Sequence, residues 1–355
     1  MFTRILMLFI PIALCIEWFL PDTPPVLRFL LALVALIPSS LAIEENTEGV
    51  AHHAGETIGG FLNSTFGNLP ELFIGVATLR LGMYELLKAQ IIGGIVVNIL
   101  FVLGLAMLIG GMKRPFQAFN TVSARNFATL LLIATMSLLI PSTYISRHEG
   151  ENTESVVALS LTIAIALTVV YACYLYFSMG THRKLIESDA GTVESQTTEK
   201  PKPLWMVVGL LLFFSLCAVL LSDMLIGTIE PAAAALNVNE LFMGLIVLGI
   251  IGNISGLVTA ISAARKDRMD LAFSVGIGSS VQQILFVVPA VVFLSYIFGP
   301  QPMNLAFDIG ISVMLLLSVI VMGALIGDGQ SHWFKGLQLL GLFGIIIAAI
   351  LFLTS

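Results

Sequence analysis

The stretch that decides the fold is Glu56-Thr-Ile-Gly-Gly-Phe-Leu-Asn-Ser-Thr-Phe-Gly-Asn-Leu-Pro-Glu-Leu-Phe-Ile-Gly75, which continues to Leu81. It is long and apolar enough to cross a bilayer, yet polar residues fall where the hydrocarbon centre is expected. They are Asn63, Ser64, Thr65, Asn68, Pro70 and Glu71. A carboxylate at that depth is costly unless it faces a cation, a partner or water. We therefore expect Glu71 to bind an ion rather than fill a kink, with Pro70 freeing backbone carbonyls beside it.

The composition places the whole chain in a membrane. It is 57% hydrophobic and 11% charged, and its mean hydropathy of +1.00 is too high for a water-soluble protein of this length. Apolar runs of about 20 residues without alternation predict an all-α integral membrane protein whose partner is the lipid bilayer. The net charge of −6 argues against nucleic acid as a partner. The three cysteines lie in apolar runs and indicate neither disulfides nor a zinc site.

About 11 transmembrane helices are expected along the chain. Their approximate ranges are 5–20, 26–54, 56–81, 85–111, 125–140, 154–179, 204–235, 239–264, 269–298, 305–326 and 333–353. The first run is interpreted as a retained span and not a signal peptide, because no small-residue cleavage site follows it. The polar segment 181–203 is rich in Ser, Thr, Glu and Pro, and it predicts a linker between two halves. The expected domains are therefore 1–22, an N-terminal transmembrane helix; 23–180, a first repeat; 181–203, a cytoplasmic linker; and 204–355, a second repeat.

The distribution of basic residues predicts the orientation. With a cytoplasmic amino terminus and alternating spans, only Arg28, Arg80, Lys88 and Arg147 fall outside, and the other basic clusters fall inside. A compact chain without a long amino-terminal tail favours the bacterial inner (plasma) membrane. The sequence leaves a homo-oligomer open.

A stripe of titratable residues ends the second expected helix. Spaced four apart, and so on one helical face, are Glu44, Glu48, His52 and Glu56, with Glu45 alongside. One interpretation is a solvated helix end. The other is a mouth through which protons and cations reach Glu71, because histidine and crowded carboxylates titrate near neutral pH.

The chain contains an internal duplication with a shift of 185 residues. This shift superposes Gly67-Asn68 on Gly252-Asn253, and Ile99-Leu-Phe-Val102 on Ile284-Leu-Phe-Val287. Glu45 falls on Glu230, which adds Glu230 to the candidate access residues. Five spans separate equivalent elements, and an odd number inverts the second copy. The predicted fold is one extra N-terminal helix plus two inverted five-helix repeats, with an ion site where their interrupted helices meet.

Two pairs of segments carry a family resemblance. GGFLNSTFGNLPEL (59–72) and GGIVVNILFVLGLAMLIGGMKR (93–114) resemble the first repeat of the calcium/proton exchanger (CAX) family of the cation/calcium antiporter superfamily. SDMLIGTIEPAAAALNVNELFMGLIVLGIIGN (222–253) and GIGSSVQQILFVVP (276–289) resemble its second repeat. The resemblance implies alternating access driven by exchange, with Ca²⁺ and H⁺ as transported ions and no cofactor. It also implies a cation site built from Asn68 and Glu71 together with their second-repeat counterparts.

One motif departs from the family pattern. Where the family's second repeat reads GNAAEH, this chain reads Gly252-Asn-Ile-Ser-Gly-Leu257, so Gly256 replaces the carboxylate. Ca²⁺ takes six to eight oxygens and usually more than one carboxylate, which leaves the transported cation open. Oxygens that can complete a site with Glu71 come from Asn68, Asn253, Thr65, Ser255, Gln282 and Asn98. For Asn98 and Gln282 a purely interhelical hydrogen bond is the alternative. A second charge can come from Glu56 or Glu230.

The functional hypothesis is a secondary active cation/proton antiporter that most simply exchanges Ca²⁺ for H⁺. The alternatives are an exchanger of Na⁺ or K⁺ for H⁺, suggested by Gly256, and a transport-inactive relative that acts as a sensor or subunit. An intramembrane hydrolase is disfavoured, because His53-Ala-Gly-Glu56 lacks the second histidine of a metalloprotease motif. No phosphate-binding loop suggests an ATP-driven pump. The sequence therefore predicts a transporter and no enzyme.

Overall fold

The computed structural model describes residues 6–20, 22–54, 59, 61–62, 65–147, 153–181 and 202–353. The expected sites at Glu56, Asn63 and Ser64, and most of the 181–203 linker, lie outside these residues. The first half contains α2 (Phe9–Phe19), α3 (Pro25–Ala54), α5 (Leu69–Arg80), α6 (Tyr84–Val96), the π-helical η1 (Val97–Val102), α7 (Leu103–Gly111), β1 (Gln117–Ala118), α8 (Thr121–Arg147), α9 (Thr153–Tyr176) and the π-helical η2 (Phe177–Thr181).

The second half begins after the linker and also consists almost entirely of helices. Its elements are α11 (Leu204–Gly227), α12 (Ile229–Leu236), α13 (Glu240–Phe242), η3 (Met243–Leu248), α14 (Gly249–Gly252), α15 (Ile254–Arg265), α16 (Met269–Phe273), η4 (Ser274–Gly278), α17 (Ser279–Gln282), η5 (Gln283–Val287), α18 (Val288–Phe298), α19 (Ile309–Leu325), β2 (Gln330–Ser331) and α20 (Trp333–Leu353). The two short strands pair antiparallel. Because α6, η1 and α7 follow one another without a break, as do α16 to α18, the longest elements are continuous helices of mixed type.

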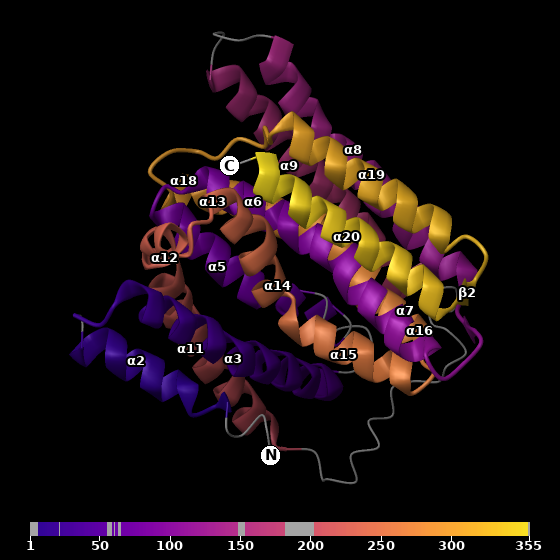
Figure 1. Cartoon of the computed structure of the whole chain (residues 1–355), viewed down its shortest axis with the longest axis horizontal. Helices are drawn as coiled ribbons and strands as arrows, with labels where there is room; N and C mark the ends of the chain where they lie inside the picture. The colour runs from indigo at the N-terminus through magenta and orange to yellow at the C-terminus, as the bar shows by residue number, and fades with distance from the viewer. Residues whose placement is uncertain are drawn as a thin grey trace.

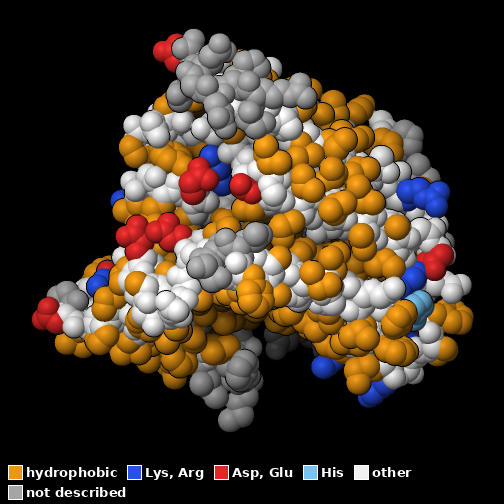
Figure 2. All heavy atoms as spheres, turned by 45° about the horizontal axis from the view of Figure 1, so that its top comes forward, with side chains coloured by type: hydrophobic (Ala, Val, Ile, Leu, Met, Phe, Trp, Pro, Cys, Tyr) orange, Lys and Arg blue, Asp and Glu red, His pale blue; other side chains and the backbone are white. Residues whose placement is uncertain are grey.

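The prediction of an all-α integral membrane protein is confirmed. Within the described residues, seven helices are long and apolar enough to cross a membrane, and a bent pair gives an eighth. The shorter apolar helices α2, α15 and α19 lie at further predicted positions. The number of eleven spans therefore stays a prediction. Hydrophobic side chains cover broad areas of the molecular face in Figure 2, and charged side chains gather in a few patches there.

Two of the ranges expected to be spans are not single continuous helices. The range 204–235 is not one helix, because α11 ends at Gly227 and α12 begins separately at Ile229. Helix α12 meets the segment 240–252 at a bend of 113°. The range 239–264 is also divided, because the helix stops at Asn253 and restarts as α15. Periodicity and hydropathy alone do not reveal such breaks, since the flanking residues are equally apolar.

The two halves repeat the same local structure. Helices α5 and α15 coincide at both ends under the 185-residue shift, and α6 and α16 begin at equivalent residues. Both broken helices restart after an asparagine of nearly identical backbone geometry, with φ −98° and ψ 13° at Asn68 and φ −104° and ψ 15° at Asn253. A π-helical segment ends at the same place in each half, at Val102 and Val287. The duplication seen in the sequence is therefore a duplication of structure.

Contacts between the halves occur in matching pairs. Helix α3 packs on α15, and α11 packs on α5; likewise α7 packs on α20, and α18 packs on α9. Helices α3 and α11 pack along each other, as do α8 and α19. Figure 1 shows α2, α3 and α11 together at the lower left, with α19 and α20 at the upper right. If a pseudo-two-fold axis relates the halves, each contact between a helix of the first half and one of the second must have a counterpart between their equivalents.

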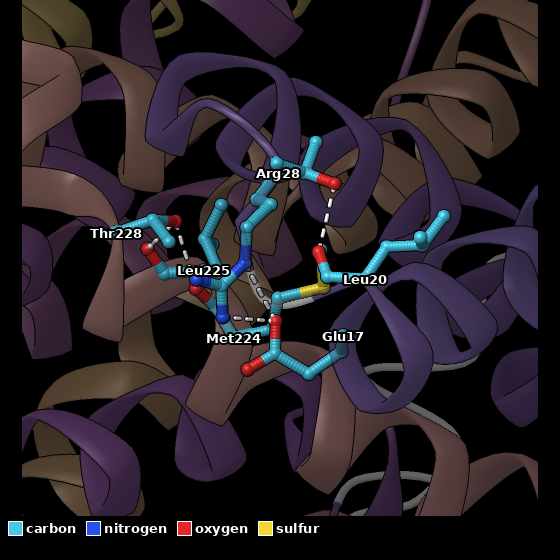
Figure 3. A network of polar contacts seen from close by, with 7 residues as sticks. Glu17, Leu20, Arg28, Met224, Leu225 and Thr228 are labelled. Carbon is cyan, nitrogen blue, oxygen red and sulfur yellow. Dashed lines mark hydrogen bonds and ion pairs between the residues drawn. The ribbon is translucent and has the colours of Figure 1, made fainter.

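Helix α2 packs against α3 and α11. Its residues Ile10 and Ala13 are buried. Arg28 of α3 donates from Nε to Glu17 Oε2 of α2 at 2.9 Å, as Figure 3 shows. In the same view the Thr228 hydroxyl donates to the Met224 carbonyl at 2.8 Å, at the end of α11. The retained first span remains a prediction, and α2 has the packing that such a span needs.

The closest approach of the halves lies where α6 meets η3 and α14. A Cβ at Gly93 would lie 2.1 Å from the Leu245 carbonyl oxygen, and a Cβ at Gly249 would lie 2.8 Å from the Gly93 carbonyl carbon. Backbone touches backbone at this crossing, and small residues are what permit it. Gly93 is therefore a close-packing residue between the two halves.

We expect Gly93→Ala to lower the free energy of unfolding in detergent by about 1–3 kcal/mol, because backbone and not a flexible side chain must move. The matched control is Gly341→Ala on α20, where no neighbouring atom lies within 4 Å of the added Cβ. This control is expected to be neutral or slightly stabilising, because alanine favours helix over glycine. An unfolding midpoint unchanged in Gly93→Ala would contradict the close approach.

Candidate functional site

A cavity of about 340 Å³ lies between the two halves, beside the breaks after Gly67 and Gly252. It is bordered by α3, α5, η1, α15 and the η4–α17 segment. Its polar lining residues are Glu44, Glu48, Asn68, Glu71, Tyr174, Ser178, Asn98, Asn253, Ser255, Thr259, Ser274, Ser279 and Gln282. Most of the candidate cation ligands read from the sequence therefore line one cavity.

Glu71 lies in the first turn of α5, directly after Pro70. Its side chain lines the cavity, and the residue is only 5% exposed. The Oε2 atom is buried and has no hydrogen-bond partner within the part of the chain that the structure describes. The positive end of the α5 dipole favours a negative charge there, but a buried carboxylate also needs a direct partner. The Glu71 carboxylate therefore borders the cavity with one buried oxygen that no described residue satisfies.

The second half and Gln90 hold Glu71 in place. The Glu71 carbonyl accepts from Gln90 Nε2 at 3.1 Å. A Cβ at Gly252 would lie 3.0 Å from Glu71 Cγ, so the break in the second half leaves room for this side chain. Gly252 of the second half thus provides space for the Glu71 side chain of the first half.

Two amide pairs link the halves across the cavity. Asn68 Nδ2 donates to Gln282 Oε1 at 2.9 Å. Asn98 Nδ2 donates to Asn253 Oδ1 at 2.7 Å, and Asn253 Nδ2 donates to the Gly249 carbonyl at 2.8 Å. The sequence left open whether Asn98 and Gln282 are ligands or interhelical bonds. In this structure both make interhelical bonds, and both also line the cavity.

The pairing departs from perfect repeat symmetry by one residue. Asn98 corresponds to Gln283 under the 185-residue shift, yet it is the neighbouring Gln282 that bonds Asn68. Gln283 is buried and instead lies against α6, where a Cβ at Gly94 would be 2.2 Å from its Nε2 atom. The two halves therefore use side chains of different length and position to reach equivalent asparagines.

Helix α3 supplies the acidic wall of the cavity. Glu44 Oε1 accepts from the Thr259 hydroxyl of α15 at 3.1 Å, and the Ser255 hydroxyl also faces this carboxylate. Glu48 follows one helical turn later, is exposed, and lines the cavity toward solvent. Part of the titratable stripe therefore borders the same space as Glu71.

The remaining candidates lie elsewhere. Glu45 is exposed and pairs with Lys202 at 3.0 Å, and His52 is exposed beyond the cavity. Glu230 is exposed on α12 and does not line the cavity. Thr65 lies beside the Tyr171 hydroxyl rather than in the lining. The position of Glu56 is outside the described residues.

Among the residues that hydrogen-bond Glu71 or Glu44, sequence reasoning missed Gln90 and Thr259. Thr259 is four residues after Ser255, so helical spacing places both hydroxyls on one face of α15 and could have revealed it. No comparable local signal exists for Gln90, because its contact with Glu71 depends on how α6 packs against α5.

No group of three or more His, Cys, Asp or Glu side chains is arranged to hold a metal ion among the described residues. A cation in this cavity would instead rely on one or two carboxylates together with amide and hydroxyl oxygens. This ligand chemistry suits hard cations such as Ca²⁺ and the alkali ions rather than transition metals.

The sodium/calcium exchanger protein family matches residues 25–180 and 206–352. The chain belongs to this family. It is 36% identical to the Ca²⁺/H⁺ antiporter of Aphanothece halophytica, covering 98% of this chain and 95% of that protein. It is 34% identical to the Ca²⁺/H⁺ antiporter ChaA of Bacillus subtilis, covering 91% of each. The resemblance identified in the sequence is thereby confirmed.

Solved structures give the same fold. The structure of native YfkE superposes with a TM-score of 0.84 at 29% identity and covers 99% of both chains. The H⁺/Ca²⁺ exchanger CAX superposes with a TM-score of 0.74 at 17% identity, covering 99% of this chain and 91% of that one. The overall arrangement of helices is thus that of membrane exchangers.

We expect Asn98→Ala and Asn253→Ala to be non-additive, with a coupling of about 0.6–1.7 kcal/mol in the free energy of unfolding in detergent. Each single variant breaks the same 2.7 Å hydrogen bond, so the second substitution removes little more. The control is the mixed pair Asn98→Ala with Gln282→Ala, which breaks one bond of each amide pair and is expected to be closer to additive. Additive losses for Asn98 and Asn253 would contradict the pairing.

Proposed function

We propose that this protein is a secondary antiporter that exchanges Ca²⁺ for H⁺ across the membrane, with the ion bound by Glu71 at the break between the two halves. The observation that carries the proposal is the Glu71 carboxylate, buried in a cavity with one oxygen unpartnered among the described residues. The relatives with 34–36% identity over nearly the whole chain that are named Ca²⁺/H⁺ antiporters support the choice of ions.

The exchange follows from competition for the same oxygens. An ionised Glu71 binds a cation together with Asn68 and Asn253 oxygens, and a protonated Glu71 releases it, because the proton removes the charge that offsets cation dehydration. The short helices α5 and α15 begin at those asparagines and pack on α11 and α3 respectively. Movement of these helix pairs opens the site alternately to either side, as inverted repeats permit.

A monovalent cation is the second candidate. Gly256 lines the cavity at the position where the family's second repeat carries a carboxylate, so that repeat contributes no charge to the site. A site with one negative charge suits Na⁺ or K⁺ better than Ca²⁺. Proton flux in liposomes driven separately by Ca²⁺, Mn²⁺, Na⁺ and K⁺ decides between the two candidates.

The proposal also includes a location. The chain is placed in a bacterial plasma membrane with its amino terminus in the cytoplasm, supported by the basic-residue distribution and by relatives from cyanobacteria and Bacillus subtilis. In that orientation Glu48 and the open end of the cavity face the cytoplasm. In this proposal the protein's small-molecule partners are the transported ions.

We expect Glu71→Gln to reduce exchange to the level of empty liposomes while the protein still folds and inserts, because it removes the buried charge and keeps the shape. Initial Ca²⁺ uptake against an imposed pH gradient measures this effect. Glu154→Gln, at the exposed start of α9, is the matched control and is expected to retain full activity. Normal exchange by Glu71→Gln would refute the assignment of the site.

A further inference from the structure

The cavity has a second carboxylate that does not come from either broken helix. Glu44 of α3 lines the cavity that contains Glu71 and is half-buried. Its Oε1 atom accepts a hydrogen bond from Thr259 of α15 at 3.1 Å. Ser255, one helical turn earlier on α15, faces the same carboxylate. The Glu44 side chain therefore reaches the surface of α15 on which the second repeat would present a charge.

The residue missing from that surface is Gly256, which lies between these two hydroxyls in the sequence. Gly256 corresponds to Glu71 under the 185-residue shift, and Val275 in front of it corresponds to Gln90. A Cβ at position 256 would lie 3.2 Å from Val275 Cγ1. The second half therefore lacks both the carboxylate and the amide found at equivalent places in the first half.

The other acidic residues of α3 are in different surroundings. Glu45 points away and pairs with Lys202, and Glu48 is exposed toward the opening of the cavity. Only Glu44 joins α3 to the hydroxyls of α15. The lining residues of the cavity include the carboxylates of Glu44, Glu48 and Glu71 and no cationic side chain, and Glu71 Oε2 has no partner in the described part of the chain.

We propose that Glu44 is the second carboxylate of the cation site, supplying from α3 the charge that Gly256 does not supply from α15. The inference rests on the proposed function and specifies its ligand set. Ca²⁺ usually takes more than one carboxylate, together with neutral oxygens such as those of Ser255, Thr259 and the paired asparagines. A cation bound by Glu44 and Glu71 also joins α3 to α5 and α15, so that occupancy and helix position are linked.

The test moves the charge from one helix to the other. Glu44→Gln is expected to weaken Ca²⁺ binding by about tenfold or more, because a charged ligand becomes a neutral one of the same shape. Adding Gly256→Glu to Glu44→Gln is expected to restore affinity to within about threefold of the wild type. Val275 has to shift by only a few tenths of an ångström to admit the Cβ of the new residue. Calorimetric titration with Ca²⁺ in detergent and Ca²⁺-driven proton flux in liposomes are the two measurements.

Glu45→Gln is the matched control, since it removes the same charge one residue along α3 but outside the cavity. Its Ca²⁺ affinity is expected to equal that of the wild type. If Glu44→Gln does not fold, Glu44→Asp carries the test, because it keeps the charge and withdraws it from the cavity by one methylene. Its Ca²⁺ affinity is expected to fall and to be restored when Gly256→Glu is added, and unchanged affinity in folded Glu44→Asp would count against the inference. If Glu44 had only a structural role, a carboxylate at position 256 would not restore the Ca²⁺ affinity of Glu44→Gln.

Unchanged Ca²⁺ affinity in folded Glu44→Gln would overturn the inference while leaving Ca²⁺/H⁺ exchange intact. Loss of affinity without rescue in the folded double variant would also overturn it. A wild type that binds Ca²⁺ without exchanging it for protons would instead contradict the proposed function, and the comparison of Glu44→Gln with Glu45→Gln would still decide the ligand.

Discussion

The arrangement of the two halves depends on burying one carboxylate inside a membrane protein. Glu71 is buried, so its charge requires a cation, a proton or a positive dipole end. The break at Asn68 provides the dipole, because it makes Glu71 a first-turn residue of α5 instead of a mid-helix one. The matching break at Asn253, with Gly252 against the Glu71 side chain, makes room for that charge. The two interrupted helices thus provide both the dipole and the space that a buried carboxylate requires.

Equivalent elements of the two duplicated halves surround the cavity. Each half contributes one broken helix, one asparagine at the break and one long helix whose amide reaches across, as in the Asn98–Asn253 and Asn68–Gln282 pairs. Every one of these bonds joins the first half to the second. The polar interactions that define the cavity are therefore made only when the halves are correctly docked, so the fold and the site are assembled by the same contacts.

The sequence predicted the membrane fold, the duplication and several residues that line the cavity, and each feature that it did not predict has a physical reason. Glu71, Asn68 and Asn253 were found because charge, amide and proline are rare in apolar runs and because the 185-residue shift superposes them. The separate start of α12 after Gly227 was missed, since hydropathy is insensitive to a break between equally apolar segments, whereas the repeat indicated the interruption at Gly252-Asn253. The shift also favoured Glu230 for a second charge, whereas the structure brings Glu44 to the cavity. The four-residue spacing of the stripe on α3 indicated Glu44 as a candidate, but its contact with Thr259 depends on the packing of α3 on α15, which no local pattern encodes.

The halves also differ in a way that affects the energetics of the whole molecule. Glu71 and Gln90 in the first half correspond to Gly256 and Val275 in the second. Two identical inverted halves would make the inward-open and outward-open forms equal in composition and hence equal in free energy. Unequal linings remove that degeneracy. Symmetry therefore does not require the inward-open and outward-open forms of the empty protein to be equally populated, and a bias between them can be set by these few side chains alone.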